Sequence, residues 1–194
     1  MSLESAYKEL ASAKRALGQM QAAPSFEIFE EEWRDFLNCL EKVWVKAERG
    51  CQQFRNKFEP WQGRYTAMRR KDMLLRYLKQ ARDADNHSIQ EVAEIKPAHT
   101  TMNFANSGGG YIERMEIRNG KIVHYEGDPM IVESHPPTVE AVRVKNHGKW
   151  FNPPTQHLGD RVESTHPAHV GELGIAFYEV FLHEAEKTFF EPKL

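Results

Sequence analysis

Apolar side chains recur every three or four residues over most of the first 95 positions, which is the spacing of amphipathic helices. A first helix is predicted over residues 3–20, and Pro24-Ser25 then breaks the run and offers a cap for the next. A second is predicted over residues 26–58, with a bend near Gly50 and an end at Pro60. Its apolar stripe is rich in aromatic rings, so we interpret this helix as a core element.

Two further helices follow from the same spacing. The third is predicted to begin at Asp72, a favoured capping residue, and to run past Val92 toward Pro97. Its apolar side comprises Leu75, Leu78, Ile89 and Val92. Helical spacing returns after Pro167 and predicts a fourth helix, with apolar positions at Val170, Leu173, Ala176, Phe177, Val180, Phe181 and Ala185.

Between Pro97 and Pro167 the pattern changes to strands and turns. Residues 111–118 and 121–126 flank Asn119-Gly120, and Asn-Gly between two alternating runs is a strong hairpin signal because both residues tolerate positive φ. A second, less regular hairpin is predicted over residues 139–151, around Asn146-His147-Gly148. This region is therefore expected to form a β-rich insertion.

These patterns predict a mainly α fold, a four-helix bundle with a β-hairpin insertion between helices three and four. We expect a single domain over residues 1–194, in which the bundle comprises 1–95 and 167–192 and the insertion comprises 97–166.

Composition narrows the class of protein. The chain is 40% hydrophobic and 28% charged, which is typical of a soluble globular domain. No charged-then-apolar leader opens it, and no apolar run approaches the roughly 18 residues of a membrane span, so we expect a cytoplasmic protein without a membrane partner. Cys39 and Cys51 form no C-x-x-C pair and are predicted to be small core residues rather than a disulfide.

Charge is distributed unevenly along the chain. The net charge is −2, yet residues 64–82 carry seven bases against one acid, Asp72. Such a run is either a solvated helix face or a patch that attracts phosphate, and both interpretations stay open here. On the second one, the candidate RNA-binding residues are Arg69, Arg70, Lys71, Arg76 and Lys79.

Arg82 and His87 stand five residues apart in the predicted third helix. Histidine titrates near neutrality and suits either proton role in RNA cleavage, while arginine holds phosphate oxygens with a permanently charged fork. At about 100° per residue the two side chains lie about 140° apart, so they cannot touch but can border one cleft. Asp83 and Asn86 fall on the adjoining polar sector.

This spacing resembles the R-x-x-x-x-H signature of HEPN domains, helical bundles that often cut or bind RNA. The resemblance covers roughly residues 1–95 and 167–190 and implies a HEPN-like four-helix bundle that acts as a homodimer. It implies Arg82 and His87 as catalytic residues, supported by Asp83 and Asn86. The predicted function is then a metal-independent endoribonuclease, with defence or toxin biology as the setting we consider.

Two other interpretations stay open. One is a non-catalytic HEPN-like module that binds a nucleotide, an RNA or a protein, and the other is a structural oligomer in which the motif ties helices together. His166 and His169 have a spacing compatible with metal binding, but no nearby Cys or carboxylate pattern completes a site. The sequence therefore predicts neither a metal nor a cofactor.

Overall fold

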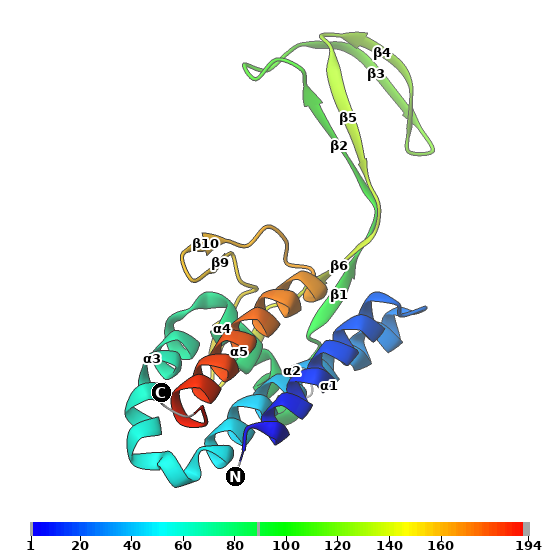
Figure 1. Cartoon of the computed structure of the whole chain (residues 1–194). Coiled ribbons are helices and arrows are strands. Elements are labelled where there is room, and N and C mark those ends of the chain that lie inside the picture. The colour runs from blue at the N-terminus through cyan, green and yellow to red at the C-terminus, as the bar shows by residue number, and fades with distance from the viewer. Residues whose placement is uncertain (1, 89, 192–194) are drawn as a thin grey trace. The chain divides into compact units, whose positions relative to one another are not determined.

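The computed structural model describes residues 2–88 and 90–191, and within them the chain forms five α-helices (Figure 1). The helices are α1 (Glu4–Gln21), α2 (Phe26–Gly50), α3 (Arg55–Lys71), α4 (Met73–Ser88) and α5 (Pro167–Phe189). In this described part of the chain, no helix is both long and apolar enough to cross a membrane.

Ten short strands in the same residues pair into five two-stranded sheets. The pairs are β1 with β6, β2 with β5, β3 with β4, β7 with β8, and β9 with β10. Their bounds are β1 (Ala93–Lys96), β2 (His99–Phe104), β3 (Ile112–Arg118), β4 (Lys121–Gly127), β5 (Met130–His135), β6 (Thr138–Ala141), β7 (Val144–Asn146), β8 (Lys149–Phe151), β9 (Gln156–His157) and β10 (Asp160–Arg161).

The prediction of a four-helix bundle with a hairpin insertion is wrong, because the described residues hold five helices and ten strands. The second helix ends at Gly50, where an added Cβ would lie 2.6 Å from the Ser2 carbonyl oxygen. After the short 3-10 turn Gln52–Phe54 the chain begins α3, and Pro60 lies inside that helix instead of ending one. The predicted bend near Gly50 is therefore the end of α2, and the continuous apolar spacing did not reveal that a separate helix follows.

The third predicted helix is also shorter than expected. It ends at Ser88 as α4, and Val92 precedes strand β1 rather than extending the helix. The Val92 carbonyl accepts a hydrogen bond from Trp33 Nε1 at 3.3 Å, a contact that fixes the chain in its non-helical path. Ile89, assigned to the apolar side of this helix, lies outside the described residues.

Three local predictions are confirmed. The first and last predicted helices appear as α1 and α5. The turn between β3 and β4 has positive φ at Asn119 (49°) and Gly120 (73°). The turn at His147-Gly148 likewise joins β7 to β8, although the earlier part of that predicted hairpin belongs to β6, which pairs with β1.

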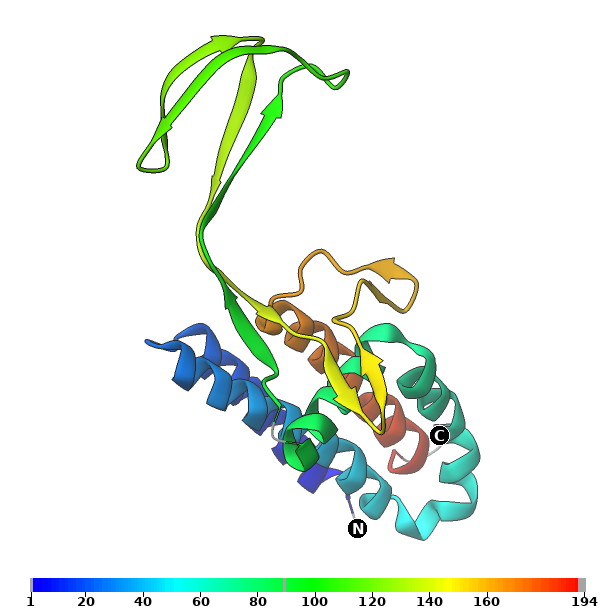
Figure 2. The same cartoon turned by 180° about the vertical axis from the view of Figure 1, so that it is seen from behind.

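The core lies among the five helices, to which α3 contributes Phe58 and Tyr65. Helices α1 and α2 run side by side in both views, and α5 packs against them (Figures 1 and 2). Trp33 is fully buried and stacks on Phe36 with 5.2 Å between ring centroids. A Cβ at Gly174 would lie 2.7 Å from Leu78 Cδ1, so this glycine lets α5 approach α4 closely. The aromatic stripe of α2 is thus a core feature, as expected.

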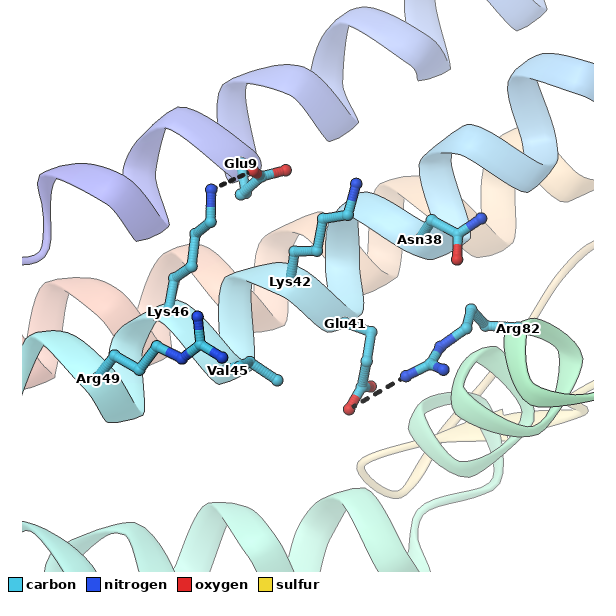
Figure 3. A pocket seen from close by; sticks show the side chains of 8 residues that line it. All are labelled: Glu9, Asn38, Glu41, Lys42, Val45, Lys46, Arg49 and Arg82. Atoms are coloured by element: carbon cyan, nitrogen blue, oxygen red, sulfur yellow. Dashed lines mark hydrogen bonds and ion pairs between the residues drawn. The ribbon is translucent and has the colours of Figure 1, made fainter. Parts of the chain in front are cut away.

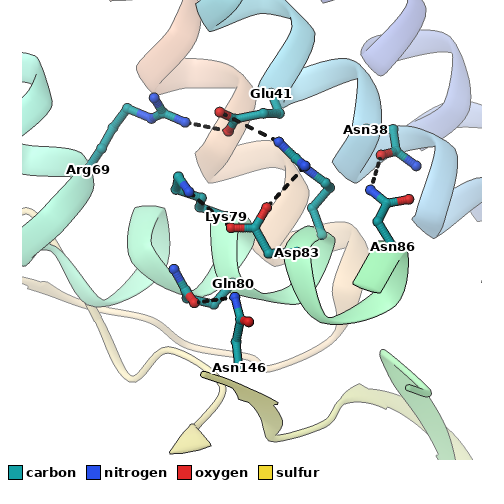
Figure 4. Close-up of polar contacts among 9 residues, drawn as sticks. Asn38, Glu41, Arg69, Lys79, Gln80, Asp83, Asn86 and Asn146 are labelled. Atoms are coloured by element: carbon teal, nitrogen blue, oxygen red, sulfur yellow. Dashed lines mark hydrogen bonds and ion pairs between the residues drawn. The ribbon is translucent and has the colours of Figure 1, made fainter. Parts of the chain in front are cut away.

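The described residues divide into two compact units. The helical unit contains those up to Ile95 together with those from Val139 onward, and the β arm is Lys96–Thr138. In the helical unit the β7–β8 hairpin packs on α4 (Figure 2). Asn146 Nδ2 donates to Gln80 Oε1 at 2.9 Å, and the side chains of this pair meet in Figure 4. Residues 139–161, expected in the insertion, thus contribute to the surroundings of the motif helix.

Candidate functional site

Asp72 fixes where the motif helix begins. Its Oδ1 accepts the Leu75 N–H at 2.9 Å, the capping bond that the sequence predicts, and its Oδ2 accepts the Leu158 N–H at 2.7 Å. His157 Nδ1 lies 3.0 Å from Oδ1. Burial acts to raise the pKa of Asp72, but the hydrogen bonds from His157, Leu158 and Leu75 outweigh it and hold the pKa below its usual value. Asp72 therefore joins α4 to the loop that carries β9 and β10.

Acidification is expected to weaken this junction. A carboxylate whose folded pKa is lowered contributes stability above its unfolded pKa, and that contribution disappears as the pH falls through the folded pKa. Asp72→Asn should therefore flatten the fall in unfolding free energy between about pH 5 and pH 2, measured by urea denaturation. Asp160→Asn, at an exposed position of the same loop, should leave the wild-type slope unchanged. An Asp72→Asn protein with the full wild-type acid dependence would contradict this role.

Arg82 lies on the side of α4 that faces α2, with 23% of its side chain exposed. Its Nη2 is 3.7 Å from Glu41 Oε1, a contact drawn in Figure 3, and its Nη1 is 3.1 Å from Asp83 Oδ1. Its Nε is buried and has no hydrogen-bond partner among the described residues. The guanidinium is thus held in one orientation with a donor still unused, unlike a freely moving surface cation.

Arg82 belongs to a network of alternating charges that joins three helices (Figure 4). On one side Asp83 also binds Lys79, with 3.0 Å between Oδ2 and Nζ. On the other side Glu41 also pairs with Arg69, whose guanidinium stacks over the Trp44 ring at 4.1 Å. The complete network is Lys79, Asp83, Arg82, Glu41 and Arg69. It links α2, α3 and α4 and leaves one positive charge in excess.

The structure brings Arg82 and Asn86 into contact with α2 and pairs Asp83 with Arg82, but it leaves His87 apart from these three residues. Asn86 Nδ2 donates to Asn38 Oδ1 of α2 at 2.9 Å. His87 is exposed near the end of α4, and no hydrogen bond or ion pair to its ring occurs within the described residues. Helical geometry places Arg82 and His87 about 140° apart and about 7.5 Å apart along the axis. One chain therefore does not join the two predicted catalytic groups in a single contact.

The predicted RNA-binding residues of the basic run separate into two groups. Arg69 is 8% exposed and, like Lys79, is engaged in the charge network. Arg70 and Lys71 are exposed at the end of α3, and Arg76 is exposed on α4 with its guanidinium 6.0 Å from the centre of the Phe151 ring. The run is thus divided between structural cations and solvated ones.

A groove of about 560 Å³ lies over the polar face of α2, and we call it the α2 groove (Figure 3). Helix α1 contributes Glu9 to its lining, and α4 contributes Arg82. Lys46 pairs with Glu9 across the groove. The remaining lining residues all come from α2, namely Asn38, Glu41, Lys42, Val45, Lys46 and Arg49. Four cations against two carboxylates give the lining a net positive charge.

Lys42 and Arg49 are the cations of this groove that the fold leaves uncompensated. Both are exposed, and neither forms an ion pair with any residue that the structure describes. They lie seven residues apart on α2, which is about two helical turns and about 10 Å along the axis. An extended anion could therefore contact both.

Sequence reasoning missed the α2 side of this site because it treated the helix wholly as core. The missed groove residues are Asn38, Glu41, Lys42, Lys46 and Arg49. Their signal was present, since positions 38, 42, 46 and 49 follow the spacing of one helical face opposite the aromatic stripe. Glu41 carried no such signal, because its role depends on arginines from two other helices.

His166 caps α5 in this structure. Its Nδ1 accepts the Ala168 N–H at 3.2 Å, and burial lowers the pKa of its ring, which favours the neutral form that this bond requires. Over residues 2–88 and 90–191, no group of three or more His, Cys, Asp or Glu side chains is arranged to hold a metal ion. His166 therefore acts as the N-cap of α5, and His169 follows it in the first turn of that helix.

Comparison of the chain with protein-family models, with curated proteins and with solved structures gives no match. The resemblance to HEPN domains accordingly stays a prediction that rests on the Arg82 and His87 spacing. We infer function from the α2 groove and from the motif helix beside it.

Proposed function

We propose that this protein is a non-catalytic module that binds the phosphate backbone of RNA in the α2 groove. The observation that carries this proposal is that Lys42 and Arg49 are exposed on the wall of a positively charged groove and form no ion pair with any described residue. Exposed cations without carboxylate partners attract polyanions, and binding then releases the counterions of the nucleic acid.

The side chains that line the groove would contact the phosphate backbone in different ways. Arg49 offers a planar fork to phosphate oxygens, whereas Lys42 acts as a compact point charge. Their separation of about 10 Å along α2 exceeds the size of one phosphate group, so the groove favours an oligonucleotide over a free ion. Arg82 lines the groove as a cation that Asp83 and Glu41 hold in a fixed orientation.

Asn38 supplies a contact suited to ribose. Its Oδ1 accepts from Asn86, so its own amide N–H groups are available at the groove. A 2′-hydroxyl can accept such a bond, and this group is what distinguishes RNA from DNA at a given site. We therefore favour RNA as the ligand over DNA of the same length.

The test is a fluorescence anisotropy titration of a short single-stranded RNA and of the matching DNA over a range of salt concentrations. The proposal predicts tighter binding of RNA and a slope of log K against log salt of about −2 to −3, for three or four phosphate contacts. Equal affinities for the DNA and the RNA would contradict the proposed hydrogen bond from Asn38 to the ribose 2′-hydroxyl. No binding of either strand at low salt would contradict the proposal.

A second candidate function is a metal-independent endoribonuclease of the HEPN type, acting as a dimer. The observation that favours it is the exposed His87 ring, which is free of partners among the described residues. In this chemistry one imidazole removes the proton of the 2′-hydroxyl, whose oxygen attacks the adjacent phosphorus. A second protonates the departing 5′-oxygen, while arginine stabilises the charge on the phosphate. Each chain would supply one imidazole to a shared site.

His87→Ala is expected to abolish RNA cleavage measured in the presence of a metal chelator while leaving thermal stability unchanged. His183→Ala provides the matched control, since His183 is also an exposed histidine on a helix, α5. Retained cleavage in the His87→Ala protein would end the nuclease assignment. Binding without turnover in the wild-type protein would favour the first proposal.

A further inference from the structure

The β7–β8 hairpin and its flanks carry positive charge without any carboxylate. Between positions 141 and 159 the sequence contains Arg143, Lys145 and Lys149 but no Asp or Glu. All three side chains are exposed, and none forms an ion pair with a residue that the structure describes. Cations that the fold leaves uncompensated on one small element attract an anionic ligand.

An exposed indole lies among these cations. Trp150 is 54% exposed and is the direct partner of Lys145 in the hairpin register, so the two side chains share one side of the hairpin. Lys145 Nζ lies 5.7 Å from the centre of the indole, and the Arg143 guanidinium lies over the same ring at 4.6 Å. The alternate residues Val144 and Asn146 are buried, so the indole and both cations are on the outward side.

Helix α4 and the segment after it hold this hairpin in place. Gln90 Nε2 donates to the Lys145 carbonyl at 2.7 Å, and Gln90 Oε1 accepts the Lys145 N–H at 2.8 Å. The Tyr77 hydroxyl of α4 donates to the Val142 carbonyl at 2.7 Å. The backbone that carries the indole is thus fixed before any ligand arrives, which reduces the entropic cost of binding.

A groove of about 300 Å³ adjoins the indole between β8 and α4. Lys149, Trp150 and Phe151 line it from β8, and Arg76 lines it from α4 with its guanidinium 6.0 Å from the centre of the Phe151 ring. The described lining contains no Asp or Glu. The volume lies at the lower end of the range for small-ligand sites, about 300–1,000 Å³. Aromatic rings and uncompensated cations therefore meet in a space suited to one small anionic unit.

We propose that Trp150 and the cations around it form a stacking site for the bases of single-stranded nucleic acid. A nucleotide joins a planar ring system to a phosphate, and this hairpin offers a partner for each part. Bases stack on aromatic rings and on arginine guanidinium planes, and Lys or Arg binds the phosphate. An acidic peptide would engage the cations but leave the exposed indole without a planar partner. The site is separate from the α2 groove and does not depend on RNA binding there.

The test follows the indole N–H groups of the four tryptophans by ¹H–¹⁵N NMR during titration with tetra-adenylate, a single-stranded RNA of four nucleotides. Loss of one signal in a Trp150→Phe protein identifies the Trp150 signal. The titration uses the full-length wild type and the full-length Lys42→Glu/Arg49→Glu variant, in which the α2 groove has lost its unpaired cations. Tetraglutamate, an anionic peptide without rings, is titrated in parallel.

Tetra-adenylate is expected to shift the Trp150 signal in both proteins with a dissociation constant of about 1 mM or below, and tetraglutamate is expected to shift it much less. Arg143→Gln should raise that constant at least about threefold, because it removes a cation and a stacking plane beside the ring. Arg161→Gln, which changes an exposed arginine of β10, should change it by less than about twofold.

Three results would overturn the proposal: no shift of the Trp150 signal, an equal shift with tetraglutamate, or equal effects of the two arginine variants. A Trp150 shift that occurs in the wild type but not in the Lys42→Glu/Arg49→Glu protein would also overturn it, because the binding would then belong to the α2 groove. Conversely, a Trp150 shift in that variant supports the stacking site even if the groove binds no RNA.

Discussion

Replacing Glu41 by glutamine is expected to lower the free energy of unfolding by about 3 kcal/mol. Glu41 is the carboxylate shared by Arg69 and Arg82, and its side chain is only 14% exposed. Removing its charge leaves two poorly hydrated guanidinium groups facing each other without a counterion between them. In a chain of this length the loss corresponds to a fall in Tm of roughly 6–12 °C.

The matched control is Glu59→Gln. Glu59 also pairs with an arginine, Arg55, but this pair lies on the surface of α3 with more than half of each side chain exposed. Exposed pairs contribute about 0–1 kcal/mol, so this variant should unfold close to the wild type. Urea denaturation of the two variants makes the comparison. Equal stability losses would mean that the network around Arg82 is no more than a set of surface ion pairs.

The double variant Lys42→Glu/Arg49→Glu is expected to weaken binding of single-stranded RNA by about 30-fold or more at moderate salt. It reverses the two cations of the α2 groove that have no ion-pair partner among the described residues. The salt dependence of binding should flatten at the same time, because fewer counterions are released. Anisotropy titrations at several salt concentrations measure both effects.

The double variant Arg70→Glu/Lys71→Glu supplies the control with the same change in net charge. These residues are exposed at the end of α3, outside the lining of the α2 groove. Binding should weaken by less than about threefold, through long-range electrostatics alone. If this variant instead lost more affinity than the groove variant, the phosphate patch would lie on the basic run and the groove proposal would fail.

Local signals in the sequence were reliable where one short segment determines its own structure. Asp72 caps α4 as predicted because the cap depends only on the carboxylate and the N–H of Leu75. Asn119-Gly120 forms the predicted turn because both residues tolerate positive φ. The limits of α1 and α5 follow from the same kind of local information.

The fold class could not be predicted because it depends on contacts between distant segments. The spacing of apolar residues runs without a gap through Gly50 and predicts only a bend there, whereas α2 ends at Gly50 and a separate helix, α3, begins at Arg55. The close approach of the Ser2 carbonyl oxygen accounts for a glycine at this position. Val92 continues the helical spacing as well, yet its carbonyl is bound by Trp33, 59 residues earlier in the chain. Periodicity identifies the buried face of a segment but not where the chain must turn.

The candidate site was predictable on one helix only. The motif directed attention to Arg82 and Asn86, which contact α2, and to Asp83, which pairs with Arg82. The residues that complete the site belong to α2. The apolar stripe of this helix led us to interpret it as a core element, so the cations on its opposite face were not considered. Pairing of Arg69 with Glu41 was likewise invisible, because the two residues lie on different helices. The pair of Lys79 with Asp83, by contrast, follows the four-residue spacing of one helix face and could have been predicted.

Photo-crosslinking of RNA that contains 4-thiouridine, followed by mass spectrometry of the peptides, tests the central claim most directly. The RNA-binding proposal predicts crosslinks to residues 38–49 of α2 and to the α4 peptide that contains Arg82, and their loss in the Lys42→Glu/Arg49→Glu protein. Crosslinks confined to the end of α3 or to the β arm would contradict the claim that the α2 groove holds the RNA.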